Sequence, residues 1–79
     1  MSKYVVFEVN CGIVEDEPLK ILTADQAKET ATMIVMNWWE EIEDIELDYV
    51  YKECIASCNR LESFSLDDDR DIKILEVLQ

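Results

Sequence analysis

The fold is decided by the stretch Thr23–Glu40, which reads TADQAKETATMIVMNWWE. Thr23 is a favourable helix N-cap, Gln26 completes a capping box three residues later, and Asp25 suits the positive end of a helix. Apolar side chains then recur at helical spacing: Ala24, Ala27, Ala31, Ile34, Val35, Trp38 and Ile42. The stretch therefore predicts a helix from about residue 24 to about residue 43, with its small residues close to a sheet and its large ones in the core.

The segment before this helix is rich in β-formers. In residues 4–14 the two-residue period of a strand places Val5, Phe7 and Val9 on one face and Tyr4, Val6 and Glu8 on the other. Gly12 is expected at a bulge or bend. Glu15–Pro18 is predicted as a turn, followed by a short return strand over Leu19–Leu22, so that the N-terminal region forms a hairpin.

Residues 45–61 fit two patterns. A helical template matches Leu47, Val50, Tyr51, Cys54, Ile55, Cys58 and Leu61. Ile45, Leu47, Tyr49 and Tyr51 also alternate as in a strand. Because the helical match is longer, we favour a second helix, with Asp44 or Asp48 at its N-terminus.

The last segment favours a hairpin, with strands at Ser63–Leu66 and Asp71–Leu78 and a turn at Asp67–Arg70. A C-terminal helix capped by Ser65 is the alternative. Residues 1–79 are then a single compact α+β domain. Its small antiparallel sheet, formed by the N-terminal hairpin and a C-terminal strand or hairpin, packs on one long helix and a second helix.

Composition argues against several classes of function. The net charge of -12 and the seven dispersed basic residues disfavour direct binding to nucleic acid or to an anionic membrane. Without histidine, a Gly-rich phosphate loop or a catalytic motif, we expect neither an enzyme nor a cofactor. The start lacks signal-peptide character, and three cysteines without CxxC spacing are typical of reduced thiols, so we expect a cytoplasmic protein.

Two acidic segments are the candidate partner-binding sites. Residues 40–48 follow Trp38-Trp39 and carry six carboxylates and no basic residue. Carboxylates at the C-terminal end of a helix oppose its macrodipole, so this charge is better suited to binding than to folding. The expected contact residues are Trp39, Glu40, Glu41, Glu43, Asp44, Glu46 and Asp48, with Asp67, Asp68, Asp69 and Asp71 as a second group.

Neither segment is predicted to bind a metal. Read as a calcium loop from Asp67, the second segment has Ile72 where glycine is required and Leu78 where glutamate is required. The ordinary alternative for both segments is a solvated surface that serves solubility alone.

This chain is similar in size, acidity and α+β character to phage-type inhibitors that mimic DNA, such as anti-CRISPR and anti-restriction proteins. The match lies in the acid density at 40–48 and 67–71 with Trp39 nearby. The resemblance implies a non-enzymatic, stoichiometric inhibitor that acts in the host cytoplasm, whose carboxylates block the basic nucleic-acid-binding site of a partner protein.

Two alternatives remain. The closing run from Arg70 to Leu78 resembles a terminal strand of barstar and of bacterial immunity proteins, which implies neutralisation of a basic nuclease. The other is a structural or assembly module that forms a homodimer through Met33, Met36 and Trp39, because the helix is apolar nearly all round there. In that case the acidity serves only solubility. The alternative for the Met33, Met36 and Trp39 surface is that the second helix covers it.

Overall fold

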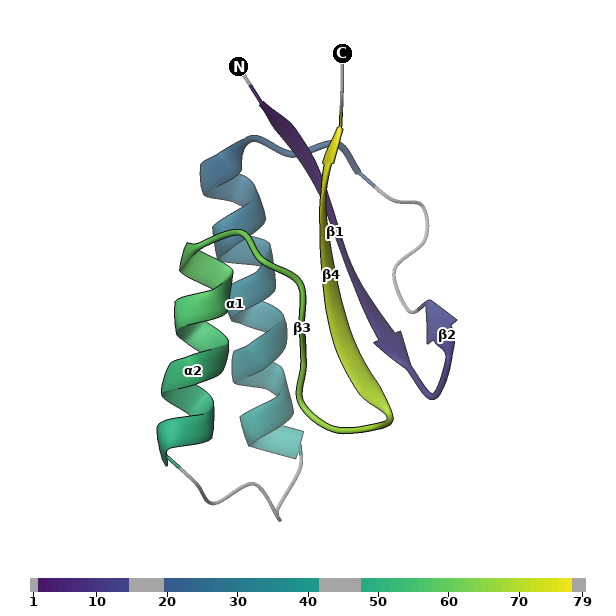
Figure 1. Cartoon of the computed structure of the whole chain (residues 1–79), viewed down its shortest axis with the longest axis vertical. Coiled ribbons are helices and arrows are strands. Elements are labelled where there is room, and N and C mark those ends of the chain that lie inside the picture. Colours follow the sequence, from purple (N-terminus) through teal and green to yellow (C-terminus); the bar gives the residue numbers. More distant parts are fainter. Residues whose placement is uncertain (1, 15–19, 42–47, 78–79) are drawn as a thin grey trace.

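Two long antiparallel strands form the centre of the molecule. The computed structural model describes residues 2–14, 20–41 and 48–77. Its elements are β1 (Lys3–Asn10), β2 (Ile13–Val14), α1 (Ala24–Glu41), α2 (Asp48–Asn59), β3 (Phe64–Ser65) and β4 (Arg70–Val77). The sheet order is β2-β1-β4-β3, and every neighbouring pair is antiparallel. Both helices lie on one face of this sheet (Figure 1), which confirms the predicted α+β class.

Helix α1 begins where its local sequence predicts. The Thr23 backbone N–H donates to Gln26 Oε1 at 3.0 Å, and the Gln26 N–H donates to Thr23 Oγ1 at 3.2 Å, so the capping box is formed. The helix buries one stripe of side chains, Ala27, Ala31, Val35 and Trp38. None of the described helices is long and apolar enough to cross a membrane.

Residues 48–59 form a helix, so the alternating pattern does not produce a strand at Tyr49 and Tyr51; Ile45 and Leu47 lie outside the described residues. Helix α2 buries Cys54 and Cys58, which are one turn apart and face α1 and the sheet. It ends at Asn59, and Leu61 just beyond it has a left-handed φ of 56°, which lets the Glu62 N–H donate to the Ser57 carbonyl.

The N-terminal hairpin turns earlier than expected. Cys11 and Gly12 have φ values of 53° and 81°, which is the geometry of a two-residue type I′ turn. The single strand predicted over 4–14 is therefore wrong, since the chain reverses at Gly12 and Ile13 pairs back with Asn10. The predicted turn at Glu15–Pro18 lies outside the described residues. Of the return strand, Leu22 forms a bridge with Tyr4.

The C-terminal hairpin is confirmed, and the alternative helix from Ser65 is wrong. Asp67 Oδ1 accepts hydrogen bonds from the N–H groups of Asp69 and Arg70, both at 2.9 Å, and so fixes the turn. β4 then pairs with β1 over eight residues.

The core lies between the helices and one face of this β1–β4 ladder. Val6 and Ile74 are opposite one another and buried, as is Ile72 in the next pair on the same face. Residues one position along each strand point to the other face, because side chains alternate.

Candidate functional site

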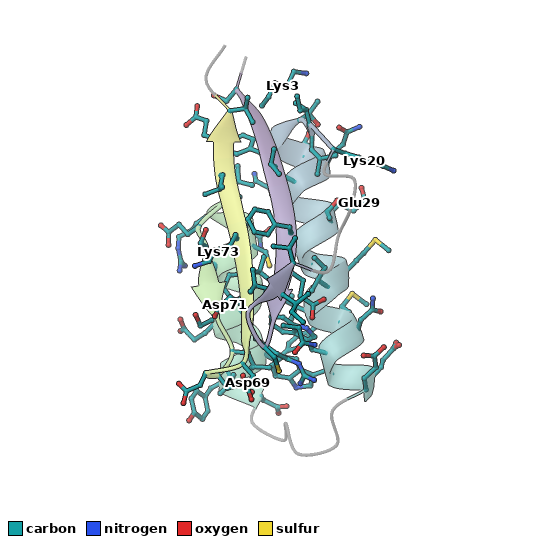
Figure 2. All side chains as sticks on the ribbon, turned by 90° about the vertical axis from the view of Figure 1, so that its right-hand side faces the viewer. Lys3, Lys20, Glu29, Asp69, Asp71 and Lys73 are labelled. Carbon is teal, nitrogen blue, oxygen red and sulfur yellow. The ribbon has the colours of Figure 1, made fainter. Side chains whose placement is uncertain are left out.

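Three segments that are distant in the sequence meet at one end of the molecule. Figure 1 shows the last turn of α1, the first turn of α2 and the turn between β3 and β4 at the same end of the long axis. Figure 2 shows Asp69 at this end, opposite the end that carries Lys3 and Lys20. We call this surface the acidic end; its described carboxylates are Glu40, Glu41, Asp48, Asp67, Asp68 and Asp69.

Hydrogen bonds hold the turn of the C-terminal hairpin in place within the acidic end. The Cys11 N–H donates to the Asp69 carbonyl at 2.7 Å, which ties this turn to the β1–β2 turn. Together with the two bonds that Asp67 accepts, this contact gives Asp68 and Asp69 fixed backbone positions. Both residues are exposed. Their charge is therefore presented from a constrained turn.

Glu40 and Glu41 occupy the last turn of α1, as predicted. Both are exposed, and the last turn contains no basic residue. Their charges face the negative end of the helix dipole, where a lysine or arginine would be more favourable. The dipole of α1 therefore disfavours these two carboxylates, and no contact among the described residues compensates for it.

Asp48 and Asp67 differ from Glu40 and Glu41, because the fold uses them. Asp48 is the first residue of α2, where a carboxylate complements the positive end of the helix. Asp67 accepts the two N–H groups of its turn. Of the described carboxylates at the acidic end, Glu40, Glu41, Asp68 and Asp69 are thus the ones with no evident folding role.

The remaining predicted contact residues lie elsewhere. Asp71 is half-buried on the sheet face that the helices do not cover, opposite Val9 and Ser65. Glu43, Asp44 and Glu46 lie outside the described residues.

Trp39 is less available than the sequence indicated. It is half-buried and packs edge-on against Tyr51 of α2, with ring centroids 5.0 Å apart and an interplanar angle of 77°. The second helix therefore covers part of the surface predicted around it. Met33 and Met36 stay exposed, at 57% and 47%.

One carboxylate has a role that the sequence did not reveal. Trp38 is buried, and its indole Nε1–H donates to Glu8 Oε2 at 2.9 Å across the interface between α1 and β1. Glu8 shares a strand face with Val6, which was the only available signal that it points toward the helices. This pair is structural, because it satisfies a polar group in the core.

The two buried thiols are not activated nucleophiles. Cys54 and Cys58 are buried, and burial raises the pKa of the Cys58 thiol to about 11, so the thiolate is disfavoured near neutral pH. Among residues 2–14, 20–41 and 48–77, no three carboxylate or cysteine side chains are grouped so that they could hold a metal ion.

No protein-family model, curated protein or solved structure matches this chain. Its function therefore has to be inferred from its own residues and their arrangement.

Proposed function

We propose that this chain is a non-enzymatic, stoichiometric inhibitor that places its acidic end in a basic nucleic-acid-binding site of a partner protein. One observation carries the proposal: separate segments of the chain meet at one end of the molecule (Figure 1), and they carry exposed carboxylates, four of which have no evident folding role among the described residues. Charge that does not serve folding is expected where a surface serves binding.

The geometry suits this role in two ways. Glu40 and Glu41 lie at the end of a helix, and Asp68 and Asp69 lie in a turn held by hydrogen bonds, so little backbone ordering is required on binding. A surface of one sign also steers an oppositely charged partner and raises its association rate by about 10- to 1,000-fold at low salt.

The experiment compares two double charge reversals with equal net charge. Glu40→Lys/Asp68→Lys alters the acidic end, and Glu29→Lys/Glu76→Lys alters exposed residues elsewhere on α1 and β4. Each tagged chain is used to capture proteins from source-cell extract at low salt. The purified captured protein is then titrated with the chain in a nucleic-acid-binding assay.

We expect the unaltered chain to abolish nucleic-acid binding at one equivalent, and the control variant to do the same. The acidic-end variant should inhibit at least about tenfold less well, which corresponds to 1.4 kcal/mol. If both variants lost inhibition equally, net charge alone would account for the effect. Inhibition unaffected by either variant would contradict the proposal.

The same experiment separates the two inhibitor classes. A captured nuclease whose activity the chain neutralises would favour the immunity-protein alternative. A captured DNA-binding effector without free nuclease activity would favour DNA mimicry. The assembly-module alternative keeps some support from the exposure of Met33 and Met36, and it requires a dimer that the double variant Met33→Glu/Met36→Glu dissociates.

A further inference from the structure

The central sheet has two apolar faces, and the described helices cover only one. In the β1–β4 register, Val5 is opposite Leu75, Phe7 is opposite Lys73, and Val9 is opposite both Asp71 and Val14. These pairs alternate with the buried pair Val6 and Ile74 and therefore point away from the helices. Figure 2 shows this face toward the viewer, with both helices behind the sheet.

We call this surface the open sheet face. Its apolar members are Val5, Phe7, Val9, Val14, Leu75 and Val77, and its charged members are Lys3, Asp71 and Lys73. An antiparallel sheet with one solvated face normally carries polar residues there. Leu75 is instead 51% exposed, and Val14 is 38% exposed. Val5, Phe7, Val9 and Val77 are half-buried, and an apolar stripe that reaches solvent at Leu75 and Val14 is typical of an interaction surface.

Charge indicates what fits this face. Its described charged residues, Lys3, Lys73 and Asp71, do not all have the same sign. Asp71 lies at the acidic-end side of the face, and Lys3 lies at the far side, as Figure 2 shows. The face is thus polarised along the strands.

We infer that the open sheet face binds a second copy of this chain, sheet to sheet, with the two copies running in opposite directions about a two-fold axis. Such an axis lies in the interface plane and across the strands, so it places Lys3 of each copy near Asp71 of the other. It also sends the two acidic ends to opposite ends of the dimer. The opposite choice, an axis along the strands, would bring the acidic ends together and would be penalised by like-charge repulsion.

The size of the face sets the strength of this dimer. Eight residues at roughly 3.4 Å each give a length of about 27 Å, and two to three strands give a width of roughly 10–14 Å. The buried area is then about 300–400 Å² for each copy, below the roughly 800 Å² per partner of a standard interface. The dimer should therefore be weak and in exchange with the monomer at micromolar concentrations.

This inference goes beyond the proposed inhibition and does not depend on it. A dimer of this form would carry an acidic end at each extremity and could engage two partner molecules.

Sedimentation equilibrium of the full chain, from about 10 μM to about 1 mM, tests the dimer. We expect the unaltered chain to pass from monomer to dimer within this range, since the small interface limits affinity. Leu75→Arg should weaken association by about tenfold or more, which corresponds to 1.4 kcal/mol. Met33→Arg, an equally exposed apolar position on α1, should leave association unchanged. Circular dichroism confirms that each variant is folded.

A charge swap tests the orientation. Lys3→Asp alone should weaken the dimer, and Lys3→Asp/Asp71→Lys should restore it, because the swap regenerates the pair between copies. Failure of the double variant to recover would overturn the antiparallel arrangement. A chain that stays monomeric at 1 mM would overturn the inference and leave the face to a different partner. Loss of association in Met33→Arg but not in Leu75→Arg would show that the dimer forms through the α1 surface instead.

Discussion

At the scale of single residues, the contact between Trp38 and Glu8 joins the sheet to the long helix. The indole N–H is in the core, and Glu8 Oε2 accepts its hydrogen bond at 2.9 Å. Without this acceptor, the buried donor would lack its partner, and a hydrogen bond to a charged group contributes about 1.5–3 kcal/mol.

We therefore expect Glu8→Ala to lower the free energy of unfolding by about 1.5–3 kcal/mol. Glu8→Gln should lose less, because its amide oxygen can still accept the indole N–H. Urea unfolding followed by tryptophan fluorescence measures both. Equal stability of Glu8→Ala and the unaltered chain would contradict a structural role for this pair.

Cys58 gives a prediction for alkaline pH. Burial raises the pKa of its thiol from 9.0 to about 11, so between these values the unfolded chain releases a proton that the folded chain retains. The unfolded state is stabilised by that release, and the free energy of unfolding should fall as pH rises from about 9 to about 11.

The control is Cys58→Ala, which lacks the thiol. Its stability should fall less steeply over the same pH range, although its absolute stability is lower because of the cavity that remains. Urea unfolding at intervals of half a pH unit measures the two slopes. Identical slopes would show that Cys58 does not titrate as described.

At the scale of elements, the carboxylates at the two helix ends of the acidic end should have opposite effects on stability. Glu40 and Glu41 oppose the dipole of α1, whereas Asp48 complements that of α2. We expect Glu40→Gln and Glu41→Gln each to raise the free energy of unfolding by about 0.3–1 kcal/mol, and Asp48→Asn to lower it by a similar amount.

Thermal unfolding at low ionic strength measures these three variants, which each remove one negative charge. A general relief of repulsion would raise the melting temperature of all three. The dipole argument requires Asp48→Asn to differ in sign, so a rise in that variant would count against it.

Local signals explain which elements were predictable. The capping box of Thr23 and Gln26 fixes the start of α1 from four consecutive residues, and the spacing of Cys54 and Cys58 favours α2 as a helix. The hairpin turn was missed because Cys11 adopts a left-handed φ of 53°, which is unusual outside glycine and asparagine. With strand-forming residues on both sides, Cys11-Gly12 lacks the Asn-Gly signature of a type I′ turn.

The meeting of the acidic segments at one end of the molecule was not predictable from the sequence. Acidic runs are visible in the sequence, whereas their meeting at one end depends on β1 pairing with β4, whose paired residues are 60 or more positions apart. The contact of Trp39 with Tyr51 was equally hidden, because it depends on how α2 packs against α1. Long-range pairing of this kind is set by the whole core and leaves no local trace.

At the scale of the whole molecule, charge is unevenly distributed along an axis 40 Å long. The acidic end concentrates carboxylates within a body whose other dimensions are only 24 and 18 Å. The Debye length is about 30 Å at 0.01 M salt and about 10 Å at 0.1 M, so these charges repel one another strongly only at low salt. Folding brings them together, and their repulsion therefore lowers the stability of the native state.

We expect the melting temperature to rise as sodium chloride increases from 0.01 M to 0.5 M, because screening removes this repulsion. Glu40→Lys/Asp68→Lys should raise the melting temperature at 0.01 M more than Glu29→Lys/Glu76→Lys. Only the first pair of substitutions removes negative charge from the acidic end. Both variants have the same net charge, so the difference between them reports position alone. Differential scanning calorimetry at several salt concentrations measures it, and the difference should shrink as salt rises. If the two variants respond alike at low salt, the acidic end does not have a stronger negative potential than the rest of the surface. It would then not steer a basic partner.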